Sequence, residues 1–135
     1  MKNKLYLGVD PGRSKTGLAL VDAEGKIIRQ QIAATATIAT AIENFIQNQN
    51  PVLIVLGNGT NNASLAAALD QVVPQLPREL IDEAHSTEEA RALYWQCNPP
   101  QGWRRLIPLG LLVPPVPLDD YAAIILVRRF LEEHK

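Results

Sequence analysis

The sequence predicts an α/β fold built around a mixed sheet, and three observations carry that prediction. Three strand-like segments follow one another near the N-terminus with short connections, which is typical of an antiparallel meander. Residues 52–56, Val-Leu-Ile-Val-Leu, form a continuous apolar run, as in a strand covered on both faces. Strand-like and helix-like segments then alternate along the chain. We therefore expect one layered domain over residues 1–135.

Each expected element has its own signal. The alternating segment at 4–10 ends at Pro11-Gly12, and residues 22–25 predict a hairpin turn. Ser86 and Glu89 are spaced as a capping box, which predicts the start of a helix. In chain order, we expect strands at 4–10, 16–21 and 26–32, a helix at 35–49, a strand at 52–56, a helix at 61–73, a strand at 79–82, a helix at 86–96, a loop at 98–118 and a helix at 121–133.

Composition bounds the classes of function. The net charge is -1 and 47% of the residues are hydrophobic, so no global basic field indicates a nucleic-acid partner. The single cysteine, Cys97, excludes an internal disulfide and a multi-cysteine zinc site. The start of the sequence carries no signal-peptide pattern, and no apolar run approaches the ~20 residues of a membrane span. We expect a cytoplasmic protein without a membrane partner, and the sequence leaves its oligomeric state open.

Carboxylates gather where expected strands end or a helix begins. Asp10 closes the first strand, Asp82 and Glu83 close the fifth, and Asp119 and Asp120 open the last helix. Strand ends are where sites collect in open α/β sheets. Clustered carboxylates repel one another, and a divalent cation such as Mg²⁺ relieves the repulsion. Two such ions about 4 Å apart can drive phosphodiester hydrolysis.

Simpler explanations stay open for single residues. Asp119 alone fits a helix N-cap, and Asp82 or Glu83 alone fits a solvated strand end. Asp10 is harder to explain in this way, because it lies in Gly-Val-Asp-Pro-Gly directly after an apolar strand. His85 could shuttle a proton or orient water, although a surface histidine at a helix start is the more common case.

Basic residues near these carboxylates are candidates for phosphate contacts. Arg13 and Lys15 lie on the loop beside Asp10, where solvated turn charges are the alternative. The long loop holds Trp103-Arg104-Arg105, which could stack on a base and contact the backbone. A tryptophan that anchors the loop to the core, with Arg104 and Arg105 in solvent, is equally compatible. Since the loop leads into the last helix, we expect it to flank a substrate groove.

Three segments resemble known nucleases. Residues 7–12, Leu-Gly-Val-Asp-Pro-Gly, with Lys-Thr-Gly-Leu-Ala at 15–19, resemble the opening of the YqgF (RuvX) family and of the RuvC Holliday-junction resolvases. Residues 82–87, Asp-Glu-Ala-His-Ser-Thr, resemble the Asp-Glu-Arg-Leu-Ser/Thr-Thr segment of the YqgF family. Residues 119–126, Asp-Asp-Tyr-Ala-Ala-Ile-Ile-Leu, resemble its C-terminal Asp-Ser-x-Ala-Ala helix. The three matches fall in the family's order.

The resemblance implies an RNase H-like fold, with strand order 3-2-1-4-5 and strand 2 antiparallel. It implies ligation of Mg²⁺ or Mn²⁺ by Asp10, Glu83 and Asp119, with Asp82, Asp120 and His85 as auxiliary candidates. It also implies a nuclease acting on structured RNA, in processing of the 16S ribosomal RNA precursor. Junction DNA is the alternative substrate.

The chain departs from the family pattern at two places. Ala84 stands where the family usually has Arg, and residues 57–61, Gly-Asn-Gly-Thr-Asn, replace the usual Gly-x-Pro form. The second segment could bind a phosphate, but a plain strand-to-helix turn fits it better. Rival functions are a junction-resolving DNA nuclease, a nucleic-acid-binding assembly factor with a degenerate site, and a fragment of an actin-like ATPase.

Overall fold

The sheet has five strands in the order β3-β2-β1-β4-β5. The computed structural model describes residues 4–59 and 63–134. β2 pairs antiparallel with both β1 and β3, while β1, β4 and β5 run parallel. This is the mixed sheet and the strand order that the sequence predicts. The strands are β1 (Leu5–Asp10), β2 (Lys15–Asp22), β3 (Ile27–Ala34), β4 (Pro51–Gly57) and β5 (Arg78–Ile81).

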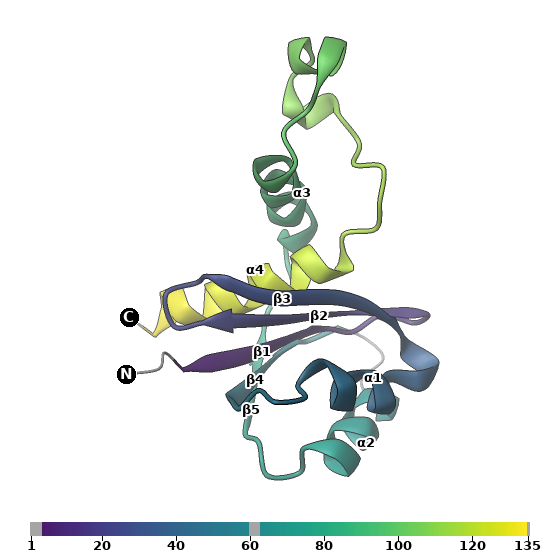
Figure 1. The fold of residues 1–135 in the computed structure, drawn as a ribbon, viewed down its shortest axis with the longest axis vertical. Coiled ribbons are helices and arrows are strands. Elements are labelled where there is room, and N and C mark those ends of the chain that lie inside the picture. Colours follow the sequence, from purple (N-terminus) through teal and green to yellow (C-terminus); the bar gives the residue numbers. More distant parts are fainter. Residues whose placement is uncertain (1–3, 60–62, 135) are drawn as a thin grey trace.

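Helices cover both faces of this sheet (Figure 1). α1 and α2 lie together on one face, and α4 lies along the other. α3 packs against α4 and stands away from the sheet, carrying the loop that follows it. The helices are α1 (Ile38–Phe45), α2 (Ala63–Val72), α3 (Ser86–Cys97) and α4 (Asp119–Glu133), with 3₁₀ turns at Thr35–Thr37, Gly102–Leu106 and Leu109–Leu111.

Alternating residues of the central strands form two cores. On β2, Leu18 and Leu20 pack in the cluster beneath α1 and α2, while Ala19 and Val21 pack in the cluster beneath α4. The same alternation runs through β4, where Ile54 and Val55 belong to opposite clusters. Side chains in a strand point to opposite faces in turn, so a strand covered on both faces is apolar throughout. This explains the apolar residues at 53–56, whereas Val52 at the start of the run is 43% exposed.

Several expected boundaries are wrong. The helix expected over 35–49 begins with a 3₁₀ turn, and its α-helical part ends at Phe45. A hydrogen-bonded turn follows over residues 46–48, and Asn48 at its end has a left-handed conformation, with φ of 64°. The strand expected at 79–82 lies at 78–81, so Asp82 follows it. Residues 61 and 62 of the helix expected at 61–73 lie outside the described residues.

The starts of the last two helices also differ from expectation. The capping box at Ser86 is wrong, because His85 is the N-cap of α3 and makes no side-chain cap hydrogen bond. α4 begins at Asp119, two residues earlier than expected, with Leu118 as its N-cap. Asp119 is therefore inside the first turn, and the N-cap explanation of this residue is also wrong.

The expected loop at 98–118 contains two 3₁₀ turns and extends away from the sheet together with α3 (Figure 1). The alternative in which Trp103 anchors it to the core is wrong, since 69% of Trp103 is exposed. None of the described helices combines the length and the hydropathy needed to cross a membrane.

Candidate active site

Asp10 ends the central strand β1, where a network of hydroxyl groups holds the following loop. Thr35 donates a hydrogen bond to the Gly12 carbonyl (2.9 Å), and its hydroxyl lies 2.8 Å from that of buried Thr16. The Thr35 backbone N–H also bonds to the Ser14 carbonyl (2.9 Å). Such bonds order the turn that follows a strand, so the backbone beside Asp10 has a defined conformation.

The start of α4 lies directly against β2 beside Asp10. Gly17 is the register partner of Asp10, and a Cβ at residue 17 would collide with the backbone carbonyl of Asp119. Glycine is therefore required for α4 to approach this closely. The approach brings Asp119 to Asp10, and both line a pocket of about 180 Å³.

Glu83 follows β5, and its carboxylate lies against the end of β4, the strand on the other side of β1. A Cβ at Gly57, the last residue of β4, would collide with the Glu83 carboxylate, and one at Gly59 would lie 2.9 Å from Oε2. Asn58 between them accepts a hydrogen bond from the Glu83 backbone N–H (3.3 Å). The described part of the unusual 57–61 segment thus surrounds Glu83, which its sequence did not indicate.

These three carboxyl groups interact strongly. The pKa of Asp10 is raised from 3.8 to about 8, first by burial, then by a hydrogen bond to Glu83 and by the negative charges of Glu83 and Asp119. Burial disfavours the charged carboxylate, and neighbouring negative charge adds to that cost. Glu83 Oε1 is also buried and has no hydrogen-bond partner among the described residues.

The donor set fits a hard divalent cation. A cation held by these residues would offset their repulsion and give the buried Oε1 a partner, and oxygen ligands are those that Mg²⁺ prefers. Within residues 4–59 and 63–134, no group of three or more potential ligands is arranged to hold a metal ion without adjustment.

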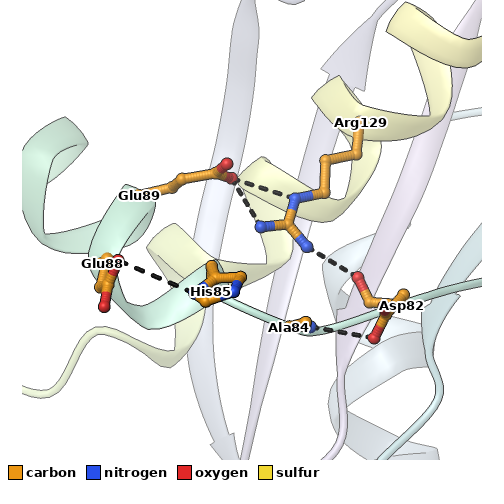
Figure 2. Close-up of polar contacts among 6 residues, drawn as sticks. All are labelled: Asp82, Ala84, His85, Glu88, Glu89 and Arg129. Atoms are coloured by element: carbon orange, nitrogen blue, oxygen red, sulfur yellow. Dashed lines mark hydrogen bonds and ion pairs between the residues drawn. The ribbon is translucent and has the colours of Figure 1, made fainter.

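Arg129 of α4 holds the segment that carries Glu83 (Figure 2). Its guanidinium donates to the Asp82 backbone carbonyl (2.8 Å) and to the Glu89 carboxylate on α3 (3.0 Å). It thus joins α4, α3 and the end of β5 at one point. Sequence reasoning missed Arg129, which lies in no motif, and it missed the contact of Asn58 with Glu83, because both residues act through distant backbone.

The auxiliary candidates have other partners. The Asp82 side chain accepts a hydrogen bond from the Ala84 N–H (3.0 Å), and His85 Nδ1 lies 3.9 Å from Glu88 (Figure 2). The Asp120 carboxylate accepts from Gln30 of β3 (2.8 Å). These three side chains therefore stabilise loops and the sheet edge around the carboxylate group.

The basic candidates divide between two regions. Lys15 begins β2, and Arg13 lines an open pocket of about 530 Å³ between the starts of α1 and α2. Arg104 and Arg105 are exposed on the loop that extends away from the sheet with α3. Arg104 lies over the Trp103 ring, 5.8 Å from its centre, and Arg105 donates to the Gly102 carbonyl (3.2 Å).

Comparison with known proteins identifies the fold. No protein-family model and no curated protein matches the chain. Among solved structures, T. thermophilus RuvC in complex with a Holliday junction substrate is similar over 97% of this chain and 96% of that one, with a TM-score of 0.59 and 14% identity. Another structure of Thermus thermophilus RuvC covers 96% of both chains at a TM-score of 0.56 and 16% identity.

A ROK family transcriptional regulator is also similar, at a TM-score of 0.48, 15% identity and 68% of this chain. The chain spans about a third of that protein's length, at 31%, and a likeness this low carries no argument. The match to RuvC over nearly the whole length of both chains, together with the order β3-β2-β1-β4-β5, gives the class: this is an RNase H-like fold of the RuvC type.

Proposed function

We propose that the chain is a metal-dependent nuclease that hydrolyses phosphodiester bonds of structured nucleic acid. The observation that carries this proposal is that Asp10 and Asp119 line one pocket at the end of the central strand, with the Glu83 carboxylate beside them, and their burial and charges raise the pKa of Asp10. A carboxyl group with a strongly perturbed pKa in a pocket indicates a functional site. The RuvC-type fold supports the same reaction class.

Asp10, Glu83 and Asp119 would hold Mg²⁺ or Mn²⁺ in this enzyme. When bound, the ions activate water and stabilise the leaving oxygen. The chain positions the ligands through two glycines. Gly17 allows Asp119 to approach closely, and Gly57 leaves room for the Glu83 carboxylate.

Arg13 and Lys15 are exposed beside the loop that follows Asp10, and we assign them to substrate phosphates. Ala84, where the YqgF family usually has Arg, is exposed as well. Arg13 and Lys15 would therefore contribute more of the phosphate binding here than the corresponding residues do in that family.

We place the chain in the YqgF (RuvX) family, with structured RNA as the substrate and the 16S ribosomal RNA precursor as its target. The three motif-like segments support this assignment, since they fall in the family's order and include all three proposed ligands. The fold also agrees with it.

A junction-resolving DNA nuclease is the second candidate. It is favoured by the full-length likeness to a RuvC structure that holds a Holliday junction substrate. A binding module with a degenerate site is the third, and it is favoured by the absence of a ready ligand group within the described residues.

A panel of end-labelled substrates distinguishes the three. Purified protein is incubated with precursor-like RNA hairpins, RNA duplex, a DNA four-way junction and DNA duplex, each with Mn²⁺, Mg²⁺ or EDTA. Metal-dependent cutting of the RNA hairpins supports the first candidate, and symmetric cutting of the junction alone supports the second. Binding without cutting, in every metal, supports the binding module and overturns the nuclease.

A further inference from the structure

The far end of α3 and the loop that follows it form a second pocket, separate from the carboxylates. Its volume is about 350 Å³, and its walls include Tyr94 and Trp95 of α3 with Trp103 and Arg104 of the loop. Tyr94 and Trp95 make an edge-to-face ring contact at 5.0 Å, so the helix side of the pocket is fixed. The loop side is aromatic and cationic.

The loop that contributes Trp103 to this pocket is unusually exposed for its composition. Trp103 is 69% exposed, and Leu106 and Leu111 on the same loop are 87% and 75% exposed. Large apolar side chains gathered on a projecting segment mark a binding surface. Trp103 does not pack into the core, so its ring is available to a ligand.

Charge indicates which ligand this surface fits. Residues 98–118 contain two arginines and no acidic residue. Arg104 lies 5.8 Å from the centre of the Trp103 ring, which places a cation beside an exposed aromatic face at the pocket. An aromatic platform with adjacent arginine stacks a nucleobase and contacts its phosphate. A purely apolar partner would leave the arginine without a counter-charge.

We propose that this pocket binds an unpaired nucleobase of the substrate, stacked on Trp103, with Arg104 at the neighbouring phosphate. The proposal rests on the proposed function and defines its substrate further. α3 has 12 residues, and a helix of that length spans about 18 Å. Since α3 starts beside Glu83, the stacked base lies roughly one helix length from the cut. The preferred substrate is thus a duplex or hairpin with an unpaired flank.

Binding in metal-free buffer tests the proposal. Fluorescence anisotropy compares a labelled duplex with the same duplex bearing an unpaired flank, as RNA and as DNA. We expect wild-type protein to prefer the flanked form about tenfold, within the usual contribution of base stacking. Trp103→Ala should remove the preference and Trp103→Phe should keep most of it. Leu106→Ala is the matched control, because it removes a more exposed apolar side chain outside the pocket.

Two results would overturn the stacking proposal, and a third would reassign this surface. Equal binding of both forms by wild-type protein, or an unchanged preference in Trp103→Ala, overturns the proposal. So does a dimer in sedimentation that Trp103→Ala and Leu106→Ala both convert to monomer, which would make this face an interface between copies. Circular dichroism confirms that each variant is folded. Because binding is measured without metal, failure here leaves the carboxylate assignment standing, and loss of cleavage alone leaves the stacking pocket standing.

Discussion

The Glu83 carboxylate lies directly over Gly57, at the point where a Cβ on residue 57 would be. Only a glycine at the end of β4 leaves room for this side chain beside Asp10. The contact joins two parts of the proposed site that are 26 residues apart in sequence. A substitution at Gly57 therefore tests the site while leaving all three proposed ligands in the sequence.

Gly57→Ala should abolish metal-dependent cleavage while leaving the fold intact. The added methyl group meets the end of a flexible side chain, so Glu83 moves away at small cost in stability. Urea unfolding and cleavage rates check the two parts. Gly110→Ala is the control, because a Cβ there meets nothing within 4 Å. If Gly57→Ala cleaves at the wild-type rate, Glu83 is not a ligand of the active site.

The free energy of unfolding of the metal-free protein should fall as pH rises from about 4 to about 8. Folded Asp10 keeps its proton up to a pKa of about 8, whereas the unfolded chain releases it near 3.8. The folded state therefore binds more protons in that window, and stability is lost through it, by up to about 1.4 kcal/mol per pH unit. Urea unfolding in EDTA at several pH values measures the slope.

In this series Asp10→Asn isolates the contribution of one group. The amide cannot titrate, so the variant should have a flatter profile and exceed wild type in stability near pH 8. Identical slopes for the two proteins would show that Asp10 titrates normally. Saturating Mg²⁺ should flatten the wild-type profile as well, since a cation replaces the proton.

Arg129→Ala should lower the cleavage rate and cost about 1 kcal/mol of stability, because it removes the bonds to the Asp82 carbonyl and to Glu89. Glu89→Gln is the matched variant, since it weakens the ion pair but leaves the bond to Asp82. If both variants cleave equally well, anchoring of the Asp82 carbonyl does not position Glu83. Rates and urea midpoints, measured together, separate positioning from stability.

Replacing Arg104 and Arg105 by alanine should shallow the slope of log affinity against log salt by about 2 units. Both side chains are exposed on the projecting loop, where each can neutralise one phosphate. Affinity for duplex should fall at low salt and less at high salt. Mg²⁺ affinity should not change, as neither residue is a proposed ligand. A wild-type salt slope would mean that both arginines stay in solvent.

Local patterns were enough to predict the sheet. Alternation at Leu7 and Val9 and the apolar run at 52–56 specify strands, and short connections specify the meander. The proximity of Asp10 to Glu83 was predictable because the ends of neighbouring strands meet at one edge, while their role as ligands stays a prediction. The helix starts were not predictable from local patterns. Leu118 is the N-cap of α4 where Asp119 was expected, and His85 is left-handed at the start of α3, because both depend on how the two helices pack. Arg129 and Asn58 were missed for the same reason: their partners are backbone groups distant in sequence.

The most direct test of the site is cleavage of the best labelled substrate by wild-type protein and by Asp10→Asn, in Mn²⁺ and in EDTA. Both proteins are purified identically, so a contaminating nuclease would appear in both. We expect cutting by wild type in Mn²⁺ only, and none by a folded Asp10→Asn under either condition. Equal cutting by the two proteins, or cutting by wild type that persists in EDTA, would contradict a metal-dependent site at Asp10.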